Sequence, residues 1–249
     1  MEGSPYINVF EREKIAELEF FHPKSNALSA AMLQELADEI SILGKRSDIN
    51  VIVLKSYGKV FCAGAFFDEL LEVKDSIEGE QFFLGFAKVI LAIKSAKALV
   101  LTKVQGKAVG GAVGIIAASD YVICSETSQV RLSELNIGIG PFVISPVIKS
   151  KISNSSFMHL ALNPKVWFNT DWLLSKGMIN EVVSATSLEE ATQSKIEEFA
   201  SFGSQAVHQL KETGSTKGLE KEMNSLAKVS GELVTNEETK RILTTFLSK

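Results

Sequence analysis

The stretch Val104–Gly140, VQGKAVGGAVGIIAASDYVICSETSQVRLSELNIGIG, decides the fold. It continues from the apolar run Ala98–Val104, which predicts a buried strand. A glycine-rich turn then leads into Ala112–Ser119, a run of small and apolar residues that predicts a buried helix. Two further strands are expected at 121–124 and 129–132. An alternation of strands and helices of this kind is typical of an α/β core.

The glycine pair Gly110–Gly111 stands at the expected N-terminus of this helix. Glycine lets another chain or a ligand approach the backbone closely, and the first N–H groups of a helix have no intrahelical acceptor. Such donors, at the positive end of the helix dipole, suit an oxygen atom that gains negative charge. A glycine corner that only packs the core has the same pattern, so this motif alone leaves both interpretations open.

A second stretch, KVFCAGAFFDEL at Lys59–Leu70, repeats this design after another apolar strand, Asn50–Leu54. It has small residues around a glycine and then the start of a helix. Two such corners predict two converging backbone N–H groups, which is what an oxyanion hole for a thioester or acyl carbonyl needs.

Four ordered motifs resemble those of the crotonase family, also called the enoyl-CoA hydratase/isomerase superfamily. They are HPKSNALS at 22–29, FCAGAFFDEL at 61–70, VQGKAVGGAVG at 104–114 and SELNIGIGP at 133–141. The resemblance implies an α/β fold, a crotonase-like spiral of repeated β-β-α units with a helical C-terminal subdomain. We place the core at residues 1–186 and the helical subdomain at 187–249. Family members are usually trimers or dimers of trimers, so the resemblance also implies a homotrimer or hexamer.

The resemblance assigns the catalytic groups position by position. The two oxyanion-hole donors fall on the backbone N–H groups of Ala65 and Gly111, which would hold the thioester oxygen as it gains enolate charge. The second of the family's two glutamates is Glu134, and its apolar neighbours favour burial and a raised pKa. The first glutamate is missing, because its position is Gly114.

The missing carboxylate bears on the reaction. A hydratase of this family positions one water between two glutamates, whereas a single base is enough to move a proton between C2 and C4 of an acyl chain. The pair Pro141–Phe142 also resembles the isomerase branch of the family. We therefore expect an enoyl-CoA double-bond isomerase. The alternatives are an enoyl-CoA hydratase, including the methylglutaconyl type, with Asp68 or Glu69 as the second acid, and a non-catalytic acyl-CoA-binding subunit.

The resemblance also implies where the CoA thioester binds. Backbone of Ala63–Phe66 would cradle the adenine, and Lys24 would meet the phosphates. The expected substrate-binding residues are Lys24, Ala63, Gly64, Phe66, Gly110, Gly114 and Phe142. The apolar helix expected at 80–95 contains three aromatic residues, Phe82, Phe83 and Phe86. Each of them is expected to pack in the core. The alternative is that they line an acyl pocket. No cofactor besides the substrate's CoA is expected, and no metal.

Composition is typical of an ordinary soluble globular protein. The chain has 249 residues, 45% of them hydrophobic and 22% charged, with a net charge of −4. Its basic residues are scattered without interleaved aromatics, which speaks against a nucleic-acid partner. Cys62 and Cys124 lie in apolar surroundings and are expected to be buried free thiols. No secretory signal and no run long enough to span a bilayer is found, so we expect no membrane partner and a cytoplasmic location.

Two local features complete the expectations. The polar stretch Lys74–Gly79 predicts a loop ahead of the helix at 80–95. Thr170 is expected to cap a short helix at 171–176.

Overall fold

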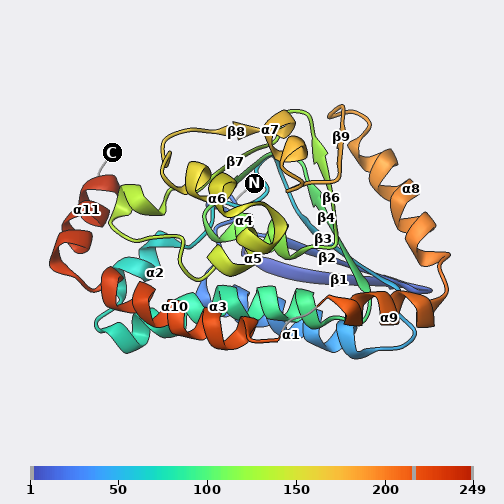
Figure 1. Cartoon of the computed structure of the whole chain (residues 1–249), viewed down its shortest axis with the longest axis horizontal. Helices are drawn as coiled ribbons and strands as arrows, with labels where there is room; N and C mark the ends of the chain where they lie inside the picture. The colour runs from blue at the N-terminus through green and yellow to red at the C-terminus, as the bar shows by residue number, and fades with distance from the viewer. Residues whose placement is uncertain (1–2, 215–216, 248–249) are drawn as a thin grey trace.

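The computed structural model describes residues 3–214 and 217–247, and a six-stranded sheet is at the centre of this part of the chain (Figure 1). The strand order is β1-β2-β3-β4-β6-β9. Only the hairpin of the first two strands is antiparallel, and every other neighbouring pair is parallel. The strands are β1 (Tyr6–Arg12), β2 (Ile15–Phe21), β3 (Val51–Ser56), β4 (Leu99–Val104), β6 (Tyr121–Ser125) and β9 (Glu181–Val183).

A smaller sheet of three short strands in the described chain stands beside the large one. It has the order β5 (Lys107–Val109), β7 (Gln129–Arg131) and β8 (Phe168–Asn169). An isolated bridge joins Cys62 to Ala108 of β5. This small sheet therefore connects the two glycine corners.

Helices cover both faces of the large sheet because successive residues of each buried strand point to opposite sides. In β3, Ile52 and Leu54 belong to the core shared with α1 and α3, whereas Val51 and Val53 pack towards α8. Parallel sheets need such two-sided cover. The helices are α1 (Ala30–Lys45), α2 (Phe67–Glu72), α3 (Ser76–Ser95), α4 (Gly111–Ala118), η1 (Glu134–Ile137), α5 (Ser145–Lys151), α6 (Asn154–Ala161), α7 (Thr170–Ser175), α8 (Leu188–Ala200), α9 (Ser204–Thr213), α10 (Leu219–Val234) and α11 (Glu237–Leu247).

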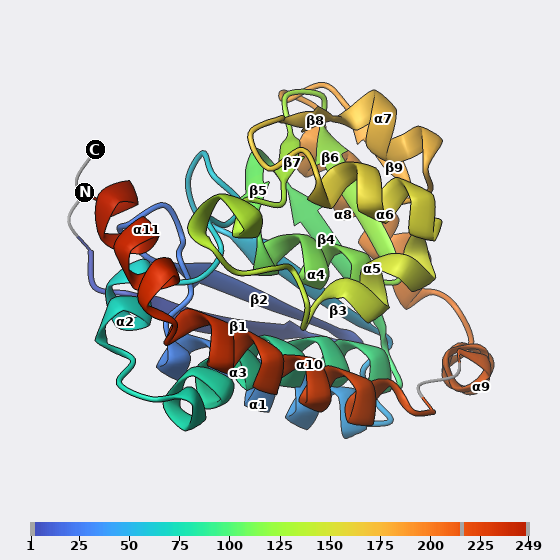
Figure 2. The same ribbon diagram turned by 60° about the vertical axis from the view of Figure 1, so that its left-hand side comes forward.

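Helix α3 lies between α1 and α10, and the three helices run side by side (Figures 1 and 2). The α3–α10 contact is so close that a Cβ atom built on Gly231 would lie 2.4 Å from the backbone nitrogen of Glu80. Met223 and Ala227 of α10 are fully buried in the main core. The boundary that we place at residues 186 and 187 falls in the turn between β9 and α8, and it stays a prediction.

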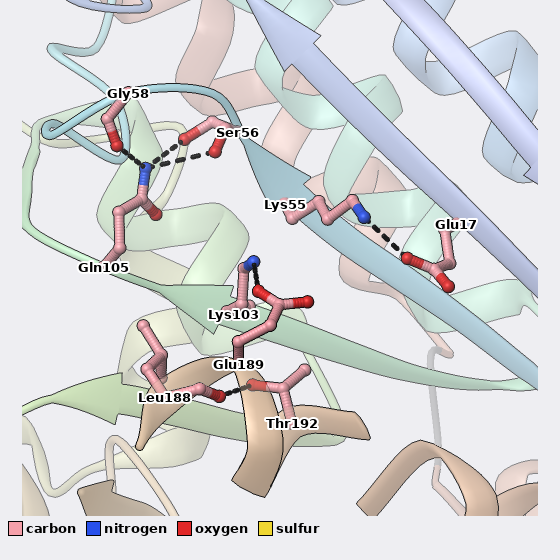
Figure 3. A network of polar contacts seen from close by, with 9 residues as sticks. All are labelled: Glu17, Lys55, Ser56, Gly58, Lys103, Gln105, Leu188, Glu189 and Thr192. Carbon is pink, nitrogen blue, oxygen red and sulfur yellow. Dashed lines mark hydrogen bonds and ion pairs between the residues drawn. The ribbon is translucent and has the colours of Figure 1, made fainter. Parts of the chain in front are cut away.

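Polar pairs hold the sheet and its α8 side in register (Figure 3). The ammonium group of Lys55 on β3 lies 2.6 Å from Glu17 Oε2 on β2, and that of Lys103 on β4 lies 2.6 Å from Glu189 Oε2 on α8. Both partners of the Lys55–Glu17 pair are largely buried, so this pair is better shielded from solvent than most surface pairs, whereas the side chain of Glu189 is 75% exposed. Within residues 3–214 and 217–247, no helix is both long enough and apolar enough to cross a membrane.

Candidate active site

The two glycine corners meet backbone to backbone. The N–H of Val109 donates to the carbonyl of Cys62 at 3.0 Å. Gly64 has φ +89°, and a Cβ atom built there would lie 2.7 Å from the carbonyl oxygen of Val109 and 3.8 Å from the nitrogen of Gly111. This left-handed, crowded position requires glycine. The predicted convergence of the corners is therefore present in the fold.

The expected oxyanion-hole donors are both available. The flanking N–H groups of Phe66 and Gly110 donate to backbone carbonyls, at 2.9 Å each. In the part of the chain that the structure describes, the N–H groups of Ala65 and Gly111 donate to no protein acceptor. Gly111 is the first residue of α4, so its N–H also has the positive end of the helix dipole behind it. Both residues line the same cleft, and their donors are left for a ligand oxygen.

That cleft has a volume of about 480 Å³, its open mouth included, and an almost wholly apolar lining. Six of the predicted site residues line it, namely Ala63, Gly64, Ala65, Gly110, Gly111 and Glu134. Phe83 and Phe86 of α3 also line it, whereas Phe82 does not belong to the lining. The ring of Phe86 lies against the corner, since a Cβ atom on Gly111 would come within 2.2 Å of its Cε1.

Glu134 brings the only carboxylate to the cleft among the described residues. It begins η1 directly after the small sheet, and its side chain reaches back to the glycine corner. A Cβ atom on Gly110 would lie 3.1 Å from Glu134 Oε1. The residue as a whole is partly exposed, yet its Oε2 is buried and has no hydrogen-bond partner in the described chain.

The surroundings of Glu134 change its acidity. Burial raises the pKa of the carboxyl from an ordinary value of 4.5 to about 7, and the backbone N–H groups of Glu134 and Ser133 offset part of this rise. A carboxyl group with this pKa gains and loses a proton near neutral pH. It is therefore suited to act as a general base and then as an acid.

Gly114 lies outside the cleft lining. A Cβ atom there would come within 2.5 Å of Ile144 Cγ2 and 3.0 Å of Ile90 Cδ1. The structure therefore does not bring Gly114 to the substrate, because apolar side chains from α3 and from the residue before α5 fill the space beside it. A second carboxylate at this position has no room.

Three further expected substrate-binding residues also lie outside the cleft lining, namely Lys24, Phe66 and Phe142. The exposed ammonium group of Lys24 pairs with Asp68 and stands 5.3 Å from the centre of the Phe66 ring, so the two lie together at the first corner. Phe142 instead packs its ring over Gly140, where an added Cβ atom would come within 2.5 Å of it.

The two alternative acids also have other partners. Asp68 is exposed and pairs with Lys24, and Glu69 Oε2 accepts the N–H of Ala30 at 2.7 Å, at the start of α1. Neither carboxylate belongs to the cleft lining.

Sequence reasoning missed the apolar residues that shape the cleft. Phe67 and Leu70 stand three residues apart on α2, a spacing that places both on one helix face and was the available signal. Ser133 adds a hydroxyl group beside the carboxylate. The other missed lining residues are Val109, Ile137, Ile139, Gly140, Pro141, Val143 and Ile144.

A spiral of β-β-α units whose two glycine corners and one buried carboxylate surround an apolar cleft defines the crotonase class of proteins. The chain belongs to the Enoyl-CoA hydratase/isomerase family, which residues 11–249 match. The predicted family and fold class are thereby confirmed.

Known relatives are distant but cover most of the chain. A short-chain-enoyl-CoA hydratase from Clostridium acetobutylicum is 25% identical over 248 residues, which cover 97% of this chain and 94% of that protein. A methylmalonyl-CoA decarboxylase from Escherichia coli is 26% identical over 229 residues, or 88% of this chain and 84% of that protein. The crystal structure of an enoyl-CoA hydratase from Bacillus halodurans superposes with a TM-score of 0.87 at 20% identity, over 96% of this chain and 99% of that one. At this identity the structural likeness shows the fold alone.

Proposed function

We propose that this protein is an enoyl-CoA double-bond isomerase that moves a double bond from C3 to C2 of an acyl chain. The N–H groups of Ala65 and Gly111 hold the thioester oxygen. Glu134 removes a proton from C2, which leaves a dienolate whose negative charge rests largely on that oxygen. The same carboxyl group then returns the proton to C4. Atoms and charge balance, because the one proton only changes carbon.

The observation that carries the proposal is that one carboxylate faces the cleft and the place of a second is filled. Glu134 is the acid that the described cleft offers, while Ile144 and Ile90 occupy the space beside Gly114. Addition of water needs one group to activate the water and another to place a proton. Transfer of a proton within one substrate needs a single group.

The setting of Glu134 supports this role. A pKa of about 7 balances proton removal against proton return near neutral pH. The apolar lining contributed by Phe83, Phe86 and Ile137 keeps water from the dienolate, where it would compete for the proton.

Hydration is the second candidate, and the likeness to the Clostridium acetobutylicum hydratase favours it. It requires a group other than a carboxylate to hold the water against Glu134. Ser133 is the other polar side chain of the described cleft and would have to take that part.

The lining also bears on the acyl group. Among the described residues no cationic side chain faces the cleft, and its walls are aliphatic, aromatic or glycine apart from Ser133 and Glu134. An acyl carboxylate would be buried without a partner and beside a carboxylate, at a high cost in free energy. The protein therefore acts on uncharged acyl chains, which disfavours the methylglutaconyl alternative and a methylmalonyl substrate like that of the Escherichia coli relative.

The test is to follow the absorbance of the conjugated enoyl thioester with 3-hexenoyl-CoA and with crotonyl-CoA. A gain with 3-hexenoyl-CoA, and no loss with crotonyl-CoA, is the expected result. The control is Glu134→Gln, which keeps the shape of the side chain and removes its basicity. Loss of absorbance with crotonyl-CoA would establish hydration instead. If the absorbance changes with neither substrate, and acyl-CoA α-protons do not exchange in deuterated water, the protein would be a non-catalytic acyl-CoA-binding subunit.

A further inference from the structure

The turn that carries Glu134 is short and has few hydrogen bonds of its own. It is a single 3₁₀ segment, η1, in which Asn136 donates to the carbonyl of Ser133 at 3.0 Å and Gly138 to that of Leu135 at 3.4 Å, and the N–H of Ile139 donates to the carbonyl of Glu134 at 3.2 Å. Hydrogen bonds of this type have poor geometry, so the position of such a turn depends on what packs against it. The contacts that anchor η1 therefore decide where the carboxylate stands.

One anchor comes from the C-terminal helix α11, which contacts η1 and lies next to α2 (Figure 2). The hydroxyl group of Thr239 donates to the carbonyl of Gly138 at 3.0 Å. The two backbones are in contact there, because a Cβ atom on Gly138 would lie 3.1 Å from Cα of Thr239. Thr239 is only 3% exposed, so its hydrogen bond is shielded from competing water.

A second anchor for the same turn is the connection between α6 and β8. The side-chain amide of Asn136 donates to the carbonyl of Pro164 at 2.9 Å. Thr239 and Asn136 thus fix η1 at two points, one near its end and one in its middle. The carboxylate of Glu134 projects from the fixed turn towards Gly110.

We infer that Thr239 is a positioning residue, which sets the place of the Glu134 carboxylate by holding the carbonyl of Gly138 to helix α11. This inference rests on the proposed role of Glu134 as the base. It assigns to the C-terminal helix, more than a hundred residues beyond the base, a part in catalysis that involves no contact with the substrate. A displacement of the base by about 1 Å is enough to cost up to a hundredfold in rate.

The experiment compares three variants. Thr239→Val keeps the shape and removes the hydroxyl group, Thr239→Ser keeps the hydroxyl group, and Thr244→Val removes an exposed hydroxyl group of the same helix that bonds to Lys240. For Thr239→Val we expect at least about a tenfold loss in kcat for 3-hexenoyl-CoA, with KM within about twofold. The other two variants should keep the wild-type rate.

A measurement that needs no catalytic turnover distinguishes a failure of this inference from a failure of the proposed function. Carbon-13 NMR of protein labelled at the Glu side-chain carboxyls follows the titration of Glu134, whose signal is assigned by its loss in Glu134→Gln. In Thr239→Val the titration should move towards the ordinary range of a glutamate, because the loosened turn admits water. It should stay in place in Thr239→Ser and Thr244→Val.

Each outcome is decisive. An unchanged rate and titration in Thr239→Val, or an equal loss in Thr239→Ser, would overturn the inference. If the wild-type protein exchanges no α-protons with any acyl-CoA, the proposed function fails, and the titration still tests the link from Thr239 to Glu134. Should Thr239→Val not fold, Thr239→Ala replaces it, because this variant also removes the hydroxyl group, and a wild-type rate and titration in it would overturn the inference.

Discussion

The carboxylate of Glu134 lies against Gly110, since a Cβ atom built on this glycine would lie 3.1 Å from Oε1. The next residue along the chain, Gly111, offers one of the two free N–H groups. The Glu134 carboxylate on η1 therefore lies beside the glycine corner that carries an oxyanion donor, so that the proton acceptor and the N–H group that would hold the thioester oxygen stand close together in the fold. Such preorganisation requires no rearrangement during the reaction.

Replacing the base is expected to stabilise the protein at alkaline pH. The Glu134 carboxyl has a pKa of about 7 in the fold and near 4.5 in an ordinary setting, so the folded state binds its proton more tightly. Stability from this group is complete below pH 4.5 and is lost as pH rises through 7. Glu134→Gln should therefore raise the free energy of unfolding by about 3 kcal/mol at pH 8 and change it little at pH 4. Urea unfolding at both pH values checks this, and an equal effect at both would contradict it.

The pH dependence of turnover follows from the same group. The reaction needs the ionised carboxylate, so kcat/KM for 3-hexenoyl-CoA should rise about tenfold per pH unit below pH 7 and level off above it. A profile measured between pH 5 and 9 tests this expectation. A rate that is already constant at pH 5 would show that Glu134 titrates in the ordinary range.

Gly114 is expected to tolerate no side chain. Gly114→Ala would place a methyl group 2.5 Å from Ile144, which should cost about 1–3 kcal/mol of stability. The matched variant is Gly114→Ala with Ile144→Ala, in which the new methyl group enters the space that the isoleucine leaves. Thermal unfolding of the pair and of each single variant should show that the loss in the pair is smaller than the sum of the two single losses. Additive losses would mean that Ile144 does not fill this space.

An acyl carboxylate should strongly reduce activity. The monothioester of CoA with 3-hexenedioic acid has the carbon skeleton of 3-hexenoyl-CoA with a terminal carboxylate. We expect kcat/KM to be at least a hundredfold lower for the charged substrate, because the described cleft offers it no cation. Comparable rates for both substrates would contradict an apolar acyl site.

Lys24 is expected to bind the phosphates of CoA without holding the fold. Its ammonium group is exposed and pairs with Asp68, and exposed pairs contribute at most about 1 kcal/mol. Lys24→Ala should raise KM several-fold and leave kcat unchanged. The control is Asp68→Ala, which breaks the same ion pair and keeps the cation, so its KM should not rise. An equal rise in both variants would assign the effect to the ion pair.

Much of the candidate site could be predicted from the family resemblance, because the motifs that carry this resemblance are local. The glycine corners, Ala65 and Glu134 each lie in a motif of fewer than a dozen residues, and the strands that precede the corners carry clear apolar runs. The contact that fills the space of the missing glutamate beside Gly114 is not local in sequence. Ile144 reaches Gly114 from thirty residues further along the chain, and no periodicity indicates such a contact.

Two local predictions were wrong for the same kind of reason. The polar stretch 74–79 is not only a loop, since Asp75 caps α3 by accepting the N–H groups of Ile77 and Glu78 at 2.9 Å each, and the helix begins at Ser76. Helix α7 is capped by Asn169 instead of Thr170. In both cases several polar residues compete for one cap, and composition does not choose among them.

The close contact between α3 and α10 has a consequence for synthesis on the ribosome. Helix α3 is apolar nearly all round, and its final cover is a helix that is translated much later. At ~5–20 residues per second, the delay between the two is on the order of 10 s. The nascent chain must keep this apolar flank from aggregating throughout that interval, and a truncated product that ends before Leu219 would present it permanently. Chaperone binding to stalled chains of increasing length should therefore end when α10 emerges.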